Sequence, residues 1–503
     1  MVAGEHAAGP SDTFGMARTS FEGLLSWLDG ADAGALDHAV LEEELDTRGR
    51  DLLRQMLQGH LDLRALREER IVGVTDAEGV CHGAVELGHV RPLATIFGPV
   101  GVTRLAYRHR GHANLYPQDG RLNLPEERQS HGLRRLAAIE SARGSFEEAR
   151  AAIGRTSGVV LGKRQVEQLA ARSAVDFDDF DAARSAPAAH AGEVVVLSCD
   201  GKGVVMRPES LRPHTAAAAA QSENRLKTRL SKGEKANRKR MAEVGAVYTV
   251  APQARTPEQV MARSGEDDAV AKAPKAANKW LIASVVDDAK EVIADVFEEA
   301  SRRDLDKACD WVALVDGNCH QIDRIEAEAK ARGIEVPIVV DLVHVLEYLW
   351  KATWSFHAEG DPAAEEWVQD KALEVLRGKA TIVAAAIRRK ATARGLDASA
   401  RKNADTCADY LLAKAPYLDY PRALTNGWPI ATGVIEGACR HLVKDRMDIT
   451  GARWGAEGAE AVLKLRAVRS NSDFEDYWRY HLDQERQRVH RSRYAGEVLP
   501  SAA

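Results

Sequence analysis

The middle of the chain alternates short apolar runs with amphipathic segments, the pattern of strands connected by helices. Residues 193–204 (EVVVLSCDGKGV) contain four consecutive apolar residues, which is typical of a strand buried on both faces. Further strands are predicted at residues 203–207, 246–250, 280–286, 311–315 and 336–340, with helices at 288–303, 322–332 and 342–356. Three strands in succession, followed by two strands that each come after a helix, predict an α/β core with a mixed sheet.

Helical periodicity dominates much of the remaining chain. Residues 17–70 are rich in Leu, Glu, Arg and Ala at helical spacing and predict one long amphipathic helix, for dimerisation or for packing within the chain. The short β-like runs at residues 71–110 predict a small sheet or hairpin. Residues 358–428 predict a helical insertion, which either contacts DNA or acts as a lid.

A more specific helical pattern precedes the first core strand. A helix at residues 146–153, a glycine-containing turn at 154–158 and a second helix at 163–173 have the proportions of a helix-turn-helix. From residue 128 to residue 172 the chain has nine Arg or Lys against four Glu. The first residues of the second helix, where such motifs read bases, are Lys163, Arg164 and Gln165. The alternative is an ordinary pair of helices with a solvated basic face.

These patterns divide the chain into six parts, with residues 182–192 as a linker before the core. They are an N-terminal helix with a small β region that is a candidate for oligomerisation (1–125), a helical DNA-binding candidate (126–182), the first part of the core (193–357), the helical insertion (358–428), a core helix (429–475) and an exposed tail (476–503).

Composition adds limits on the class of protein. With 503 residues, 45% hydrophobic and 29% charged, the chain has the composition of a soluble globular protein of several domains. The formal net charge of −6 is no general sign of a nucleic-acid partner, so such a partner requires local basic patches. The six cysteines include no CxxC pair, which argues against a zinc ribbon or a disulfide framework. No signal peptide or 18-residue apolar run is present, so we expect a cytoplasmic protein without a membrane span.

One local basic patch follows the first core strand. Residues 225–240 contain eight Arg or Lys against one Glu and have no apolar periodicity, which predicts a mobile basic arm. The candidate DNA-binding residues in this arm are Arg225, Lys227, Arg229, Arg238, Lys239 and Arg240. A solvated surface loop is the alternative, although a basic arm next to a carboxylate site suits a polyanionic substrate.

Two carboxylates are predicted at the ends of core strands. The order of elements is that of the ribonuclease H-like topology, in which Asp200 and Asp316 end neighbouring parallel strands. Asp341, which ends the next strand, competes with Asp316, but it lies one strand further out, ~10 Å instead of ~4.8 Å from the first. Asp316 is therefore preferred. A buried carboxylate needs cations or hydrogen-bond donors around it, unless Asp200 merely caps a turn with Gly201.

A third carboxylate is expected from a helix near the C-terminus. In TGVIEGACRHLVKDRM, Thr432 and Gly433 open a helix whose first turn contains Glu436. The buried stripe of this helix is formed by Ile435, Ala438 and Leu442. The alternative role of Glu436 is an i,i+4 ion pair with Arg440.

The motifs SCDGKGV, LVDGN, DLVH and TGVIEGACRHLVKDRM resemble those of the DDE transposases of bacterial insertion sequences, in particular the ISKra-type group. The resemblance covers about residues 95–475 and includes YPQDGRLNLP, SFEEA and TGARW. It implies a ribonuclease H-like catalytic core with a helical insertion, preceded by a mainly helical region with a helix-turn-helix. It also implies that Asp200, Asp316 and Glu436 bind two divalent metal ions and that Asp341 and His344 support them. Arg440 and Arg446, in and after the same helix, are further candidates for DNA contact.

The chemistry implied by this resemblance is phosphoryl transfer. Mg²⁺, or alternatively Mn²⁺, suits oxygen ligands; one ion activates water or a DNA 3′-hydroxyl, and the other stabilises the leaving oxygen. The expected partners are terminal-repeat DNA, target DNA and further copies of the chain, in the cytoplasm at the bacterial nucleoid. Two alternatives stay open: a catalytically silent DNA-binding protein on the same scaffold, and an oligomerisation protein built on the N-terminal helix. Unlike commoner relatives, the N-terminal part has no cysteine-pair zinc element, which leaves the mode of DNA recognition open.

Overall fold

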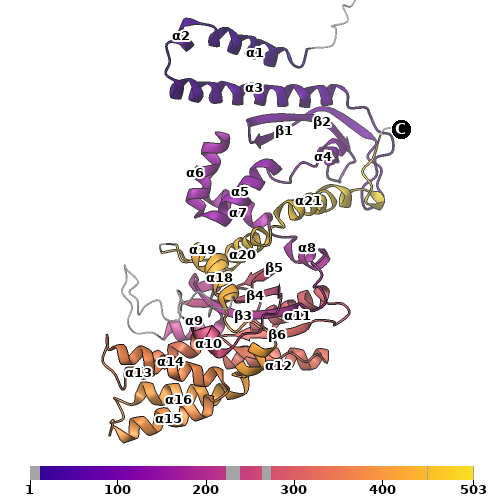
Figure 1. Ribbon diagram of the computed structural model, residues 1–503. Coiled ribbons are helices and arrows are strands. Elements are labelled where there is room, and N and C mark those ends of the chain that lie inside the picture. Colours follow the sequence, from indigo (N-terminus) through magenta and orange to yellow (C-terminus); the bar gives the residue numbers. More distant parts are fainter. Residues whose placement is uncertain (1–11, 222–237, 263–272, 450, 502–503) are drawn as a thin grey trace, which may run out of the picture. The chain divides into compact units, whose positions relative to one another are not determined.

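The computed structural model describes residues 12–221, 238–262, 273–449 and 451–501, and the chain forms two compact units (Figure 1). The first unit combines residues 1–181 with 474–503, and the second comprises residues 182–473. Among the helices of the described residues, none has both the length and the apolar character that crossing a membrane requires.

The second unit is a mixed α/β structure built on a five-stranded sheet. Its strands are β3 (Val194–Val205), β4 (Lys239–Val250), β5 (Ala276–Ser284), β6 (Asp310–Val315) and β7 (Ile338–Val340), in the order β5-β4-β3-β6-β7. The first three pair antiparallel, and β6 and β7 run parallel to β3. The predicted meander followed by two strands that each come after a helix is therefore confirmed, and the residues Val194–Leu197 are at most 2% exposed, as a central strand requires.

Strand β3 differs from the prediction in one respect that matters for Asp200. The runs predicted at 193–204 and 203–207 form one strand, so Asp200 lies within it and caps no turn. Parallel pairing with β6 stops at Leu197, opposite Ala313, whereas antiparallel pairing with β4 continues to Val205. Asp200 thus lies just beyond the carboxyl end of the parallel pairing.

Helices cover the two faces of this sheet. The crossovers are α11 (Ala289–Arg303) and α12 (Cys319–Arg332), and α11 packs closely on β4 because Gly245 has no side chain: a Cβ there would lie 2.6 Å from a methyl of Val296. Cys199 pairs with Gly245 and shares its face, so the next residue, Asp200, points to the opposite face. Helix α18 (Gly433–Ala438) packs on β3 and β4, and α20 (Ala456–Ser470) packs on β5.

The predicted helical insertion is confirmed, and it packs on the helix that follows β7, α13 (Leu342–Thr353). Its helices are α14 (Pro362–Leu376), α15 (Ala380–Ala393), α16 (Lys402–Lys414) and α17 (Tyr420–Thr425). Three further α-helices of this unit are α9 (Pro213–Ala220), α10 (Pro257–Met261) and α19 (Asp445–Met447), the last preceded by a π-helical segment, η3 (Cys439–Lys444).

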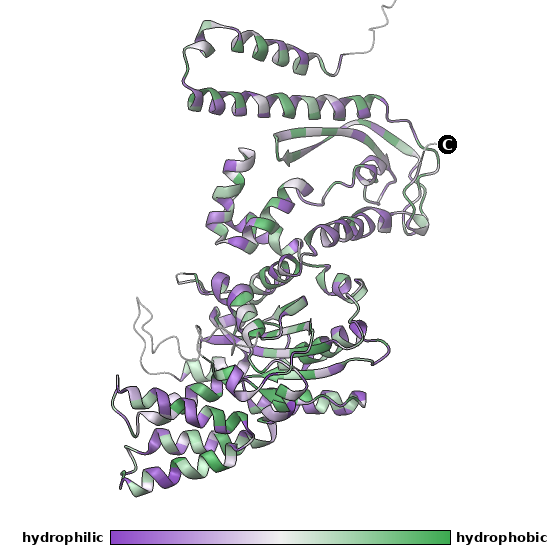
Figure 2. Cartoon of the chain, viewed as in Figure 1, coloured by the Kyte–Doolittle hydropathy of each residue, from purple (hydrophilic) through white to green (hydrophobic). Residues whose placement is uncertain are grey.

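The first unit begins with helices rather than with the single long helix expected at residues 17–70, so that prediction is wrong. They are α1 (Gly15–Leu28), α2 (Ala31–Gly34) and α3 (His38–Leu66), and α1 packs against α3. The helical conformation is interrupted after Asp29. The Asp37 side chain then caps α3 by accepting a hydrogen bond from the Val40 N–H (3.0 Å). Hydrophobic and hydrophilic residues alternate along α3 (Figure 2), as in an amphipathic helix. The expected hairpin is confirmed as β1 (Ala84–Thr95) and β2 (Gly98–Arg108).

Helices α5 (His131–Arg143), α6 (Phe146–Ser157) and α7 (Lys163–Arg172) pack together in the same unit. The two helices predicted for the helix-turn-helix are therefore present, with α6 continuing to Ser157 and ending at Gly158, whose positive φ of 70° suits glycine. Short helices flank this group: α4 (Pro117–Arg121) precedes it and α8 (Phe177–Ala183) follows it.

The C-terminal segment is not the exposed tail that its Arg-rich composition suggested. Residues 474–485 form helix α21 (Phe474–Glu485), in which Tyr477 and His481 are fully buried. The Tyr477 hydroxyl donates to the Ser173 carbonyl (2.6 Å), and His481 Nδ1 lies 2.6 Å from the Asp176 carboxylate. Aromatic residues at helical spacing give α21 a buried face, which the neighbouring arginines concealed in the sequence.

Candidate metal site and basic residues

Asp200 projects from β3 toward the segment that follows α18. Its Oδ2 accepts a hydrogen bond from the Cys439 thiol (3.2 Å), and its Oδ1 accepts one from the Gly201 N–H (2.6 Å). Burial, together with the charge of Asp200, raises the pKa of Cys439, so the thiol stays protonated and can donate. Asp200 is thereby tied to the helical segment that also contains Glu436.

Asp316 follows β6 directly and is held by its own turn. Its Oδ1 accepts a hydrogen bond from the Asn318 N–H (2.8 Å), and the intervening Gly317 has a φ of 95°. A Cβ at Gly317 would lie 3.1 Å from the Tyr410 hydroxyl, so this phenol lies against the turn. Burial raises the pKa of Tyr410, and the charges of Tyr348, Asp316 and Asp341 raise it further.

Asp341 follows β7 and is fully buried. It caps α13, because its Oδ1 accepts a hydrogen bond from the Val343 N–H (2.8 Å). Its Oδ2 accepts a hydrogen bond from the Thr432 hydroxyl and lies 3.2 Å from His344 Nδ1. The segment before α18 is fixed beside it, since the Leu342 N–H donates to the Ile430 carbonyl (2.9 Å).

Glu436 lies in the first turn of α18, as predicted from the sequence. Ile435 and Ala438 are each 2% exposed and form the buried side of this helix, whereas Glu436 is exposed. The Thr432 hydroxyl lies 3.3 Å from Glu436 Oε1. Arg440 forms its ion pair with Asp445 (3.7 Å), so the alternative pairing of Arg440 with Glu436 is not what the structure shows.

Three potential ligand atoms lie within 4.8 Å of one another, one each from Asp341, His344 and Glu436. They are close enough to hold a metal ion. The Thr432 hydroxyl lies within hydrogen-bonding distance of both carboxylates and so connects Asp341 with Glu436. Two carboxylates and an imidazole fit a divalent cation such as Mn²⁺ or Mg²⁺. The donor set therefore suits a metal ion.

Of the predicted group of Asp200, Asp316 and Glu436, only Glu436 belongs to the set of three potential ligands around Asp341. Among the described residues, the set within 4.8 Å contains Glu436 but neither Asp200 nor Asp316. Asp341 was expected to lie outside the metal site because its strand is one position further across the sheet from Asp200 than that of Asp316. Glu436, however, lies on a helix whose start is beside Asp341, so strand spacing does not determine the distance between Asp341 and Glu436.

Thr432, Cys439 and Tyr410 are neighbours of these carboxylates that sequence reasoning missed as functional residues. Thr432 was identified only as a helix start, although its hydroxyl lies between two carboxylates. Cys439 lies one helical turn after Glu436, a spacing that could have indicated a shared side of the helix. Tyr410 comes from the insertion, and no local pattern connects it with Asp316.

The predicted DNA-binding residues lie in different surroundings. Lys163, Arg164 and Gln165 are exposed in the first turn of α7, where Gln165 also caps the helix by accepting a hydrogen bond from the Gly162 N–H (2.8 Å). Arg440 is exposed as well, with 73% of its side chain accessible. These four residues are available for contact with a polyanion.

The candidates around residue 240 differ in exposure. Lys239 and Arg240 belong to β4, so the predicted arm does not extend to residue 240; Lys239 is exposed and Arg240 is half-buried. Arg240 donates to the Val286 carbonyl (3.1 Å), and burial lowers the pKa of its guanidinium. Arg446 is 2% exposed and lies over the Trp454 ring (4.6 Å), which indicates a packing role. Arg238 is half-buried directly before β4, and Arg225, Lys227 and Arg229 lie outside the described residues.

Comparison of the chain with models of known protein families and with curated proteins finds no match.

Proposed function

We propose that this chain is a metal-dependent transposase of the DDE type, built on a ribonuclease H-like core. The observation that carries the proposal is the strand order β5-β4-β3-β6-β7 combined with carboxylates on or directly after β3, β6 and β7. A helix packed on β3 and β4 adds the carboxylate of Glu436. In α/β sheets, the carboxyl ends of parallel strands are the usual place for a functional site.

The metal-binding residues of this proposal are Asp341, His344 and Glu436, with Asp200 and Asp316 as carboxylates of the same core. A bound divalent ion would polarise a phosphate oxygen and lower the pKa of a bound water. Thr432 orients both Asp341 and Glu436 through its hydroxyl, and His344 fixes the Asp341 carboxylate. Because Glu436 and, in part, His344 are accessible while Asp341 is buried, a substrate reaches the group from the Glu436 side.

DNA is the proposed substrate. The exposed residues Lys163, Arg164 and Arg440 supply local positive charge in a chain whose net charge is −6. Action on DNA ends as a homo-oligomer is supported by apolar side chains on α1 and α3 that the chain leaves accessible. They are Met16, Phe21, Leu25, Leu28, Val40, Leu45, Leu53, Met56 and Leu66.

The test is cleavage of duplex DNA carrying the ends of the encoding element, with Mn²⁺ or Mg²⁺ and with chelator. We expect nicking that requires the metal and that Glu436→Gln abolishes. The matched control is Glu457→Gln, the same substitution at an exposed glutamate in the first turn of α20. Metal-independent binding without nicking would instead identify a catalytically silent DNA-binding protein.

A further inference from the structure

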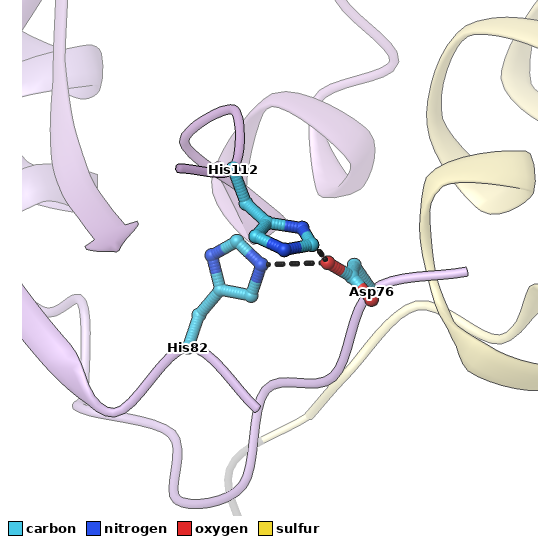
Figure 3. A group of neighbouring side chains, drawn as sticks. All are labelled: Asp76, His82 and His112. Carbon is cyan, nitrogen blue, oxygen red and sulfur yellow. Dashed lines mark hydrogen bonds and ion pairs between the residues drawn. The ribbon is translucent and has the colours of Figure 1, made fainter. Parts of the chain in front are cut away.

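A second group of potential ligands lies in the first unit, at the open end of the β1–β2 hairpin (Figure 3). Asp76 and His82 come from the loop before β1, and His112 comes from the loop after β2. Asp76 Oδ2 lies 3.0 Å from His82 Nε2 and 3.0 Å from His112 Nδ1. Two imidazoles, one from each loop, thus converge on one carboxylate oxygen of Asp76.

The backbone around Asp76 leaves that oxygen free of other donors. The Val80 N–H donates to Asp76 Oδ1 (2.8 Å), and the Asp76 N–H donates to the Val80 carbonyl (3.0 Å), which closes a tight loop through Gly79 at a φ of 85°. Asp76 is 5% exposed and His82 is 1% exposed. The loop therefore presents Oδ2, and not Oδ1, to the two imidazoles.

The surroundings of His82 determine which of its ring nitrogens carries a proton. Its Nδ1 faces the Tyr107 carbonyl (3.3 Å), and a carbonyl can only accept, so Nδ1 carries the proton. The other ring nitrogen, Nε2, faces Asp76 Oδ2 at 3.0 Å and is the atom that can serve as a metal ligand. A carbonyl that fixes the outer nitrogen of an imidazole is also the usual support of a metal-binding histidine.

We propose that Asp76, His82 and His112 form a site for a divalent transition metal of the zinc class. Two imidazoles and one carboxylate are ligands that Zn²⁺ accepts, with bonds of about 2.0 Å and ligand atoms about 3.3 Å apart in a tetrahedron. The separations of 3.0 Å between Asp76 and each imidazole are close to this spacing. The fourth position would be open to water, because the His112 side chain is 35% exposed.

His109 is the nearest further histidine. Its ring centroid lies 5.3 Å from that of His112 and 6.0 Å from that of His82. It lies outside the set of ligand atoms within 4.8 Å, and its Nδ1 faces the Cys81 carbonyl at 3.1 Å. We therefore do not count His109 among the metal ligands.

The site has a structural consequence for the whole first unit. Asp76 forms a β-bridge with Tyr494, and the adjacent Ala77 N–H donates to the Arg493 carbonyl (3.0 Å). An ion held by Asp76, His82 and His112 would therefore stabilise the loop before β1, the loop after β2 and the docked C-terminal segment together. This inference is independent of the proposed transposase activity.

The experiment uses the full chain, freed of metal with a chelator and titrated with Co²⁺ and then Zn²⁺. To separate the two groups, all proteins carry Glu436→Gln. We expect one equivalent of Co²⁺ with the intense visible absorption of a tetrahedral site, displacement by Zn²⁺, and a Zn²⁺-dependent rise in Tm. His112→Gln, at the most accessible ligand, should lower the Zn²⁺ affinity at least about 10-fold.

Two controls keep the proposal falsifiable. His89→Gln alters a histidine of the same hairpin that pairs with Glu86 (2.9 Å) and belongs to no group of three ligands among the described residues, so it should leave metal binding unchanged. Far-UV circular dichroism of metal-free His112→Gln shows whether the variant folds, and His109→Ala tests the role of that neighbour. Equal Zn²⁺ affinity of the parent and His112→Gln would overturn the proposal, as would no Zn²⁺ binding by the parent.

Discussion

The group of Asp341, His344 and Glu436 and the group of Asp76, His82 and His112 have similar arrangements and differ in one ligand. In each, one oxygen of a buried aspartate accepts a backbone N–H, from Val343 at Asp341 and from Val80 at Asp76, and the other oxygen faces a histidine. The third member is the exposed carboxylate of Glu436 in one group and the partly exposed His112 in the other. The carboxylate-rich group suits a hard ion that also binds phosphate, whereas the imidazole-rich group suits a structural zinc-class ion.

A third Asp/His pair shows what such residues do without a metal. Asp176 lies 2.6 Å from His481 Nδ1 and accepts a hydrogen bond from Arg488 (2.9 Å), so the Arg488 guanidinium compensates its charge. Burial opposes ionisation of Asp176, but the hydrogen bonds from His481 and Arg488 lower its pKa to about 2. An Asp/His pair by itself therefore does not indicate a metal site. The other partners of the aspartate distinguish an ion pair from a candidate metal site.

The largest expected effect comes from removing a carboxylate of the first group. Asp341→Asn should lower metal-dependent DNA cleavage about 10³-fold, a loss of several kcal/mol of transition-state stabilisation, because the buried metal-binding oxygen is lost. Asp76→Asn should leave the cleavage rate per folded molecule unchanged. Single-turnover rates of both variants check this contrast, and equal losses would remove the functional distinction between the groups.

Removing the carboxylate of the Asp176–His481 pair should give the next largest effect, which is on stability. Asp176→Asn should lower the free energy of unfolding of the first unit by about 3 kcal/mol, because His481 and Arg488 lose their buried counter-charge. Urea unfolding with and without Zn²⁺ measures it, and the loss should be the same in both.

The same pair has a defined pH dependence. The folded pKa of Asp176 is depressed to about 2, so its contribution to stability is fully present above its unfolded pKa of about 3.9 and is lost as the pH falls through about 2.

His131 causes a loss of stability at higher pH, because burial lowers its pKa to about 4. Its neutral form stabilises the fold above pH ~6.5, and this contribution falls as the pH drops toward 4. Unfolding of His131→Gln between pH 7 and pH 4 should therefore be less acid-sensitive than that of the parent.

Replacing one histidine by a carboxylate in each group should sharpen the comparison with a smaller effect. His344→Asp makes the first group all-carboxylate and should shift its preference from transition metals toward Mg²⁺, about 10-fold in relative affinity. His112→Asp should weaken Zn²⁺ binding at the second group by a similar factor. Competition titrations with Mg²⁺ and Zn²⁺ measure both, and an unchanged metal preference at either group would contradict the assignment.

The smallest effect concerns the surface arginines. Arg164→Ala and Arg440→Ala should each reduce the salt dependence of DNA binding by about one unit of slope, since each exposed guanidinium neutralises one phosphate. Arg446→Met should leave the slope unchanged, because Arg446 is buried over Trp454. A reduced slope for Arg446→Met would show that the segment opens on binding.

Much of the second unit could be predicted from the sequence because its signals are local. Uninterrupted apolar runs indicated the core strands, and the buried stripe of Ile435, Ala438 and Leu442 indicated the helix with Glu436 in its first turn. In the first unit, residues 71–110 were identified as a hairpin for the same reason. The division of residues 17–70 into separate helices was missed, because the helical spacing of apolar residues continues across the interruption at Asp29.

The sequence alone therefore determined the order of strands and helices and the presence of acidic residues at their ends, because both depend on neighbours within a few positions. Only the tertiary structure decided which of those residues meet. Asp341 joins Glu436 through Thr432, and His112 reaches Asp76 across the hairpin. The Arg-rich C-terminal segment docks because Tyr477 and His481 find buried partners some 300 positions away, at separations of 304 and 305 residues. Such contacts depend on how elements pack, and no local pattern of hydrophobic and polar residues contains that information.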